Sequence, residues 1–176
     1  VVMYSDHGYQ AGDRKAFHKF TLWEEACRAP MMIYVPGQTP RVVDDPVSLM
    51  DAAQTICDYA GIGLMDYSPA VSLRPYVEGG ALPARWVPSF WYGSASATDG
   101  QTRIIRYADG SSELFDVSTT DHLTVPLPLT DSRFAPALDG LLAACEDYGY
   151  LLVEQGMSAK PGAPWVGFMG EPGSED

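Results

Sequence analysis

Short apolar runs separated by amphipathic segments organise the first half of the chain. Residues 1–4 form an apolar run that stops at the polar turn 5–8, and a second apolar run occupies 31–35 between Pro30 and Pro36. Compact apolar runs bounded by turn residues are typical of buried strands. The sequence therefore predicts two buried strands, and we expect the first to be the exit of an element that begins earlier.

Two helices are predicted in the same half from their N-terminal signals. Thr21 followed by Glu24 has the spacing of a capping box, for a short helix that ends at about Cys27, ahead of a proline. Ser48 and Asp51 have the same spacing before a longer helix that ends at a glycine. The longer helix is predicted to bury an apolar stripe made of Leu49, Ala52, Ala53, Ile56 and Ala60.

The second half of the chain follows the period-two pattern of antiparallel strands. Strands are predicted over 86–92, 102–107 and 112–117, and the Asp-Gly pair at 109–110 has the composition of a hairpin turn. A final amphipathic helix follows, with a stripe made of Phe134, Leu138, Leu141, Leu142, Cys145 and Tyr148. The pattern thus predicts α/β elements first, and a small antiparallel sheet with one helix second.

These elements divide the chain into three expected parts. Residues 1–85 would form part of an α/β core, and residues 86–155 the antiparallel sheet with its terminal helix. Residues 156–176 would form an irregular tail that is rich in glycine and proline. The large apolar side chains of the tail could dock on a neighbouring surface, and a disordered end explains the same composition equally well.

Composition and charge narrow the classes of partner. The chain carries 23 acidic against 11 basic residues, a net charge of −12, which disfavours nucleic acid and anionic membranes as partners. It contains no uninterrupted apolar run of about 18 residues, so no membrane span is predicted. Its cysteines, Cys27, Cys57 and Cys145, form no C-x-x-C pair, so neither a disulfide framework nor a zinc site is expected. The first residues show no signal-peptide pattern, and the compartment stays unassigned.

The densest group of chemically active side chains follows the first predicted strand. Asp6 and His7 fall in the turn 5–8, and His18 and Lys19 lie on the loop after it. The carboxyl end of a strand is where open α/β sheets hold ligands. A carboxylate and an imidazole there can bind a divalent cation, and a lysine can balance the charge of an anionic substrate. An Asp-His-Gly turn is also compatible with a plain surface turn.

The order of landmarks in this region resembles that of a known family. The stretch SDHGYQAGDRKAFHKFTLWEEACRAPMMIYVPG resembles the segment of type I sulfatases, in the alkaline-phosphatase-like superfamily, in which a strand ends in Ser-Asp-His-Gly. The landmarks that follow here in the family's order are Gly12, Lys19, Trp23-Glu24, Arg28-Ala29-Pro30 and the apolar run 31–35. A weaker resemblance continues through 47–62 and through the hairpin region at 84–92 and 102–122, and stops at about residue 125.

The resemblance implies a fold, an activity and a set of site residues. Type I sulfatases have an alkaline-phosphatase-like α/β fold, and this chain would be its C-terminal part, followed by the small antiparallel sheet with a helix and the irregular tail. The family hydrolyses sulfate esters with calcium and a formylglycine made from the cysteine of a C-x-P-x-R motif. By matching position, Asp6 would be a calcium ligand, and His7 a ligand or a hydrogen-bond partner of the sulfate. Lys19 would stabilise the sulfate oxygens, and His18 is a further substrate-binding candidate.

The chain lacks parts that a sulfatase needs. No C-x-P-x-R motif is present, so the formylglycine is absent from this chain, and the early paired aspartates that bind calcium are missing as well. Asp6 and His7 alone are too few for a calcium site of about six to eight oxygen ligands. We therefore expect calcium to bind only if another chain supplies the missing ligands.

The hairpin also departs from the family pattern. The histidine and arginine that family members often carry ahead of the Arg-Tyr strand fall at about Ala95 and Thr98 here. No charged side chain from this hairpin is then expected to face the substrate unless Arg103 or Arg106 turns toward it. His122, which stands where the family often has Asp-Pro-His-Glu, is predicted to be a loop histidine.

Two functional hypotheses stay open. In the first, the chain is one part of a sulfatase that acts on a sulfate ester, and a partner chain carries the nucleophile and the other calcium ligands. In the second, it is a pseudoenzyme, a non-catalytic module reused as a structural or decoration element in a larger assembly such as a virion. Both predict another protein chain or assembly that covers the open edge of the sheet. A phosphatase or phosphonate hydrolase of the same superfamily fits less well, because Lys-Phe-Thr-Leu-Trp-Glu at 19–24 indicates the sulfatase branch.

Overall fold

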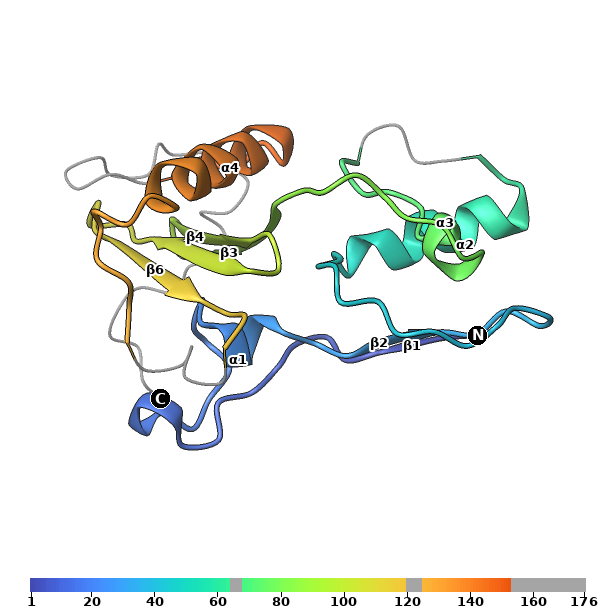
Figure 1. The fold of residues 1–176 in the computed structure, drawn as a ribbon, viewed down its shortest axis with the longest axis horizontal. Coiled ribbons are helices and arrows are strands. Elements are labelled where there is room, and N and C mark those ends of the chain that lie inside the picture. Colours follow the sequence, from blue (N-terminus) through green and yellow to red (C-terminus); the bar gives the residue numbers. More distant parts are fainter. Residues whose placement is uncertain (64–67, 120–124, 153–176) are drawn as a thin grey trace, which may run out of the picture.

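The computed structural model describes residues 1–63, 68–119 and 125–152. Its elements are β1 (Val2–Tyr4), the 3-10 helix η1 (Asp13–Lys15), α1 (Glu24–Cys27), β2 (Met31–Ile33), α2 (Met50–Ala60), α3 (Arg74–Val77), β3 (Val87–Trp91), β4 (Ser94–Thr98), β5 (Thr102–Arg106), β6 (Ser112–Asp116) and α4 (Phe134–Asp147). They form two groups side by side (Figure 1), one with β1, β2, α2 and α3, and the other with β3 to β6 and α4. None of the described helices is long and apolar enough to span a membrane. The predicted tail and His122 lie outside the described residues.

β1 and β2 form a two-stranded antiparallel ribbon, in which Val2 lies opposite Ile33. The two predicted strands are therefore confirmed in type and place. The prediction that they are buried is wrong, because Met3 and Met32, which pair with each other in the middle of the ribbon, are both more than half exposed. The described residues add no third strand to this ribbon that could cover it.

α2 buries part of its polar side and exposes part of its apolar stripe. The Asp51 carboxylate accepts a hydrogen bond from the N–H of Ser48 at 2.8 Å, and the Ser48 hydroxyl accepts one from the N–H of Met50 at 3.3 Å. The predicted apolar stripe is wrong at Ala53, Ile56 and Ala60, which are exposed. The side chains that are buried instead belong to Asp51, Ala52, Gln54 and Thr55. Exposed apolar side chains along a helix indicate a surface that another part of a protein covers.

The buried polar side chains of α2 hold the connection that follows it. The fully buried Asp51 accepts a hydrogen bond from the N–H of Val71 at 3.0 Å and forms an ion pair with Arg85. The hydroxyl of Thr55 accepts a hydrogen bond from the N–H of Leu73 at 2.8 Å. An irregular segment has no helix or strand partners for its backbone groups, so side chains must supply them. This requirement places polar residues on the inner side of α2.

β3 to β6 form a four-stranded antiparallel sheet in chain order. β4 has no predicted counterpart, because its sequence Ser-Ala-Ser-Ala-Thr lacks the alternation of large apolar and polar residues. All five of its side chains are nevertheless buried. Ala95 and Ala97 belong to the core under α4, whereas Ser96 binds Arg103. Because these side chains are small, polypeptide can approach the sheet closely on both faces.

α4 covers one face of this sheet and α1 lies on the other (Figure 1). The main core lies under α4 and is formed by Ala95, Ala97, Ile104, Leu114, Ala137, Leu141 and Cys145. A smaller core on the opposite face joins Leu22 to Ile105 and Phe115. The N-terminal segment that carries the candidate site residues is therefore attached to the sheet by its own apolar contacts.

Gly140 allows the close contact between α4 and Trp86. A Cβ atom at this position would lie 2.2 Å from two atoms of the Trp86 indole ring. Gly140→Ala is therefore expected to lower the free energy of unfolding by about 1–3 kcal/mol, measured by urea unfolding. Helix propensity alone would instead stabilise the protein by about 1 kcal/mol, so a gain in stability would contradict the packing argument. The loss should shrink in a Trp86→Leu background.

Candidate active site

The polar turn after β1 is held against α1. The N–H of Ser5 donates to the carbonyl oxygen of Pro30 at 3.1 Å, and the N–H of Gly8 donates to that of Ala26 at 2.9 Å. A Cβ atom at Gly8 would lie 1.9 Å from the carbonyl oxygen of Glu25, so no other residue fits without a backbone shift. The two residues inside the turn are thus fixed between the ribbon and α1.

His7 and Lys19 form the centre of the candidate site. The ammonium nitrogen of Lys19 lies 2.8 Å from Nε2 of His7, and Nδ1 of His7 lies 2.5 Å from the carbonyl oxygen of Gly8. An ammonium group can only donate, so Nε2 accepts, and the neutral ring carries its proton on Nδ1, where it faces the carbonyl. A carboxylate oxygen of Asp6 lies 3.5 Å from the same Nε2, and the Asp6 side chain is 80% exposed. The structure therefore brings these three predicted residues together.

The loop between β1 and α1 positions Lys19. The N–H of Gln10 donates to the carbonyl oxygen of His18 at 3.1 Å and so ties the two arms of the loop together. The side chain of His18 is exposed, and in the described part of the chain it does not line the cavity that Asp6, His7 and Lys19 line. A substrate-binding role for His18 stays a prediction.

Asp6, His7 and Lys19 open into a cavity of about 480 Å³. The rest of its wall is mainly apolar and includes Phe20, Leu49, Met50, Phe90, Trp91 and Tyr148. A concave, mostly apolar site with a few polar groups at one end is the usual form of a small-molecule site. The position of the Lys19 ammonium group at this end suits an anionic group on the ligand.

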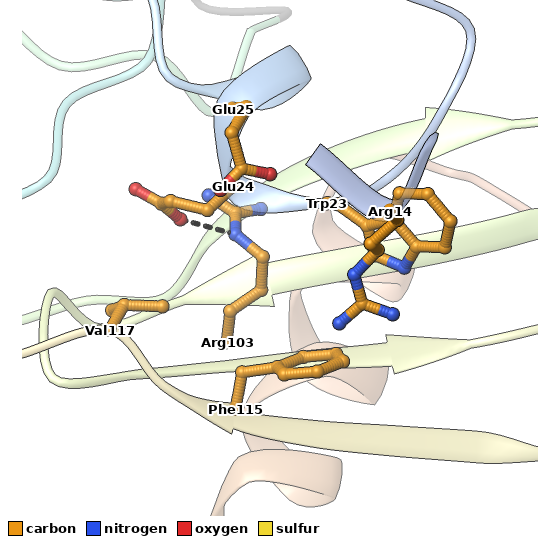
Figure 2. Close-up of a pocket in the computed structure, with 7 residues that line it drawn as sticks. All are labelled: Arg14, Trp23, Glu24, Glu25, Arg103, Phe115 and Val117. Atoms are coloured by element: carbon orange, nitrogen blue, oxygen red, sulfur yellow. Dashed lines mark hydrogen bonds and ion pairs between the residues drawn. The ribbon is translucent and has the colours of Figure 1, made fainter. Parts of the chain in front are cut away.

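A much smaller pocket shows how α1 is joined to the sheet (Figure 2). Nε of the buried Arg103 lies 2.6 Å from the Glu24 carboxylate, and Nη1 donates to the hydroxyl of Ser96 at 3.0 Å. The capping box predicted for Thr21 and Glu24 is therefore wrong, because the Glu24 carboxylate binds Arg103 and α1 has no side-chain cap. Arg103 does not line the candidate cavity, and Arg106 donates to a serine of β6.

Arg14 fastens the loop to the same face of the sheet. Its guanidinium carbon lies 4.3 Å from the centre of the Trp23 ring and 4.7 Å from that of Phe115, and Figure 2 shows it between the two rings. Glu113 accepts hydrogen bonds from the indole N–H of Trp23 at 3.4 Å and from the hydroxyl of Tyr107 at 2.5 Å. Burial, followed by the hydrogen bond to Glu113, raises the pKa of Tyr107. These cation–π and polar contacts make the sheet the support of the site loop.

The described residues do not form a complete calcium site. No group of three or more His, Cys, Asp or Glu side chains converges within residues 1–63, 68–119 and 125–152. At the turn only Asp6 and His7 offer donors, whereas calcium takes about six to eight oxygen ligands. The donor set of the described residues therefore does not fit a resident calcium ion by itself, although the exposed carboxylate of Asp6 can act as one ligand.

Cys145 lies in an environment that favours a neutral thiol. Burial raises the pKa of Cys145 to about 11, so this thiol stays protonated in the core under α4. Cys27 packs against the smaller core, with its sulfur 3.8 Å from the carbonyl oxygen of Thr21. Since the thiolate is the reactive form of cysteine, the environment of Cys145 does not suit a nucleophile.

Comparison with known proteins relates this geometry to a family. The family model for sulfatases matches residues 1–62. The chain is 30% identical over 120 residues to a sulfatase from Formosa agariphila, a match that covers 66% of this chain and 24% of that protein. It is 32% identical over 143 residues to arylsulfatase K of Mus musculus, a match that covers 70% of this chain and 26% of that protein. A solved 2-O GAG sulfatase superposes with a TM-score of 0.70 at 22% identity, covering 84% of this chain and 35% of the other.

The described elements are thus a part of the alkaline-phosphatase-like sulfatase fold. The chain belongs to the sulfatase family and corresponds to the C-terminal part of such a protein. It spans about a quarter of the length of the curated relatives it matches. The expected sulfatase ancestry and fold class are confirmed by these matches.

One wall of the cavity was missed by the prediction from sequence. Phe20 and Trp91 are stacked with their ring centres 5.3 Å apart, and Trp91 also contacts the ring of Tyr92 edge-on at 4.5 Å. The available signal was the sequence Trp-Tyr-Gly at 91–93, which places aromatic residues at a tight turn. Because the sequence does not predict β4, it also does not predict that residues 91–94 form the turn of a hairpin.

Proposed function

We propose that this chain contributes Asp6, His7 and Lys19 to the active site of a sulfate-ester hydrolase and is not catalytic alone. A complementary polypeptide, from a longer chain or from a partner chain, would carry the C-x-P-x-R nucleophile and the remaining calcium ligands. The observation that carries this proposal is the contact of 2.8 Å between Nε2 of His7 and the ammonium nitrogen of Lys19. Both side chains, together with Asp6, line the cavity of about 480 Å³.

Lys19 is proposed to bind the sulfate oxygens. One of the three donors of its ammonium group is directed to His7, which leaves two for an anion in the cavity. His7 is held in turn by the carbonyl oxygen of Gly8, so the imidazole orients the ammonium group. A fixed positive charge there would stabilise the negative charge that develops as the sulfur–oxygen ester bond breaks.

Asp6 is proposed as one calcium ligand among several. Its carboxylate is exposed at the mouth of the turn, and a carboxylate oxygen is the ligand type that calcium prefers. The other oxygen ligands would come from the complementary polypeptide. Calcium bound there would supply charge neutralisation for the sulfate group.

The open apolar surfaces of this chain support a complementary polypeptide. The large exposed side chains on the ribbon and on α2 belong to Met3, Tyr4, Met32, Met50 and Ile56. A groove of about 500 Å³ lies between β2 and α3, with a lining that is largely apolar. Contiguous apolar surface and open strand edges are normally covered by protein. The covering polypeptide would be the same one that completes the active site.

Native mass spectrometry of material isolated from its source tests this proposal first. A companion chain in equal amount that contains C-x-P-x-R, or one longer chain that contains both parts, would support the enzyme. A large assembly without such a sequence would overturn it. The function would then be that of a non-catalytic module, with Asp6, His7 and Lys19 as remnants.

In the complete protein, Lys19→Ala is expected to lower kcat/KM for 4-nitrophenyl sulfate by about 10²- to 10³-fold, as for the loss of one transition-state donor. Lys15→Ala is the matched control, because Lys15 is an exposed lysine of the same loop that does not line the cavity. Its kcat/KM should stay unchanged. Equal activity in the two variants would exclude Lys19 from the site.

A further inference from the structure

The cavity beside Lys19 has an aromatic platform at its surface. Phe20 follows Lys19 in the chain, and its ring centre lies 5.7 Å from the Lys19 ammonium nitrogen. Trp91, the last residue of β3, stacks on Phe20 at an interplanar angle of 23°. Phe20 is 57% and Trp91 38% exposed, and neither belongs to the two cores of the sheet. Packing within the described chain therefore does not account for these two large rings.

The turn that carries Trp91 is fixed in a strained conformation. Tyr92 has a φ of 48°, in the left-handed region that bulky residues rarely adopt, and Gly93 follows with a φ of 72°. The N–H of Gly93 donates to the hydroxyl of Tyr150 at 2.9 Å, and this hydroxyl lies 3.2 Å from the carbonyl oxygen of Ser94 and donates to it. Backbone strain that the surroundings hold in place is typical of functional sites. The strained turn fixes the position of Trp91 at the edge of the aromatic platform.

The charged side chains that line the cavity indicate an anionic ligand. Among the described residues that line it, Lys19 and His7 are the groups able to carry positive charge, and Asp6 is the acidic one. The neutral imidazole of His7 accepts a hydrogen bond from the Lys19 ammonium group. The ammonium group is therefore the positive charge that these two residues present to the ligand. This end of the cavity thus suits a sulfate group, and the aromatic platform beside it suits a ring that carries that group.

We propose that Phe20 and Trp91 form a subsite for the leaving group, which takes the flat face of a six-membered ring that bears one sulfate. The sulfate would lie at Lys19, and the ring, phenyl or pyranose, would stack on the exposed aromatic platform beside it. Flat rings gain stacking energy on aromatic side chains in addition to their burial. This inference rests on the proposed function of Lys19 as the sulfate-binding residue.

Binding measurements on the complete protein test the subsite separately from catalysis. The probes are phenyl sulfate, glucose 6-sulfate, ethyl sulfate and inorganic sulfate. Their Kd values are determined by isothermal titration calorimetry on protein in which the C-x-P-x-R cysteine is replaced by alanine, so that the esters are bound but not hydrolysed. Trp91→Leu and Phe20→Leu remove the flat rings and keep apolar bulk, so that the turn can fold. Each variant is expected to weaken at least one ring-bearing probe by about three- to ten-fold, and to leave ethyl sulfate and inorganic sulfate unchanged. Comparison of phenyl sulfate with glucose 6-sulfate identifies the kind of ring.

Phe17→Leu is the matched control, because Phe17 is an exposed phenylalanine of the same loop that does not line the cavity. It should leave all four affinities unchanged. Unaltered affinity for both ring-bearing probes in Trp91→Leu and Phe20→Leu would overturn the inference. An equal loss for inorganic sulfate would overturn it as well, because the rings would then act only on the shape of the site. Absence of any sulfate binding by the wild type would overturn both this inference and the proposed role of Lys19.

Discussion

Asp51→Ala is expected to lower the free energy of unfolding by about 3–5 kcal/mol, the usual result of breaking a buried ion pair from one side. The Asp51 carboxylate is fully buried, pairs with Arg85, and accepts hydrogen bonds from the N–H groups of Ser48 and Val71. Its removal leaves a largely buried guanidinium group without its partner and two backbone N–H groups without acceptors. Urea unfolding followed by circular dichroism measures the loss.

Two variants calibrate this result. Asp51→Asn keeps an acceptor oxygen but no charge, so its loss should be smaller than that of Asp51→Ala. Asp147→Ala removes an exposed carboxylate at the end of α4 and should change the free energy of unfolding by no more than about 0.5 kcal/mol. If Asp51→Ala behaved like Asp147→Ala, the polar side of α2 would not be what holds the following connection.

Arg103→Ala is expected to lower the free energy of unfolding by a similar amount, about 3–5 kcal/mol. It leaves the largely buried Glu24 carboxylate without its positively charged partner. Arg103 is 4% exposed, and its ion pair with Glu24 joins β5 to α1. The turn of the candidate site is bound to α1 by the hydrogen bond that the N–H of Gly8 donates to the carbonyl oxygen of Ala26. Loss of Arg103 should therefore also speed hydrogen exchange at the N–H of Gly8, measured by NMR.

A double-mutant cycle separates the ion pair from general damage to packing. Arg103→Met with Glu24→Gln removes both charges and keeps apolar volume, so the double variant should be less destabilised than the two single variants added together. Strict additivity, with unchanged exchange at Gly8, would show that α1 is held by the apolar contacts of Leu22 alone.

Much of the fold could be predicted from local signals. Compact apolar runs bounded by turn residues located β1 and β2, and the alternating pattern around an Asp-Gly turn located β5 and β6. β4 could not be predicted, because its small residues are selected by close packing on both faces and carry no periodic signal. The burial of the ribbon and of α2 also could not be predicted, because it depends on which polypeptide lies beside them.

The candidate site was predictable in part for the same reason. Asp6 and His7 are neighbours in a turn, and their place after a strand is a local property of the sequence. The contact between His7 and Lys19, the ion pair of Arg103 with Glu24, and the stacking of Phe20 on a hairpin turn all join distant parts of the chain. Sequence patterns of short range contain no information about such contacts.

The ribbon of β1 and β2 is the less supported side of the candidate site. Within the described residues, no third strand joins this ribbon, and an isolated pair of strands is marginally stable in water. The Asp6 turn begins where the ribbon ends. One end of the turn is secured to the sheet through α1, and the other end is held only by the ribbon. The free chain would therefore hold its carboxylate and its ammonium group loosely, and would sequester little calcium or sulfate ester before the complementary polypeptide arrives.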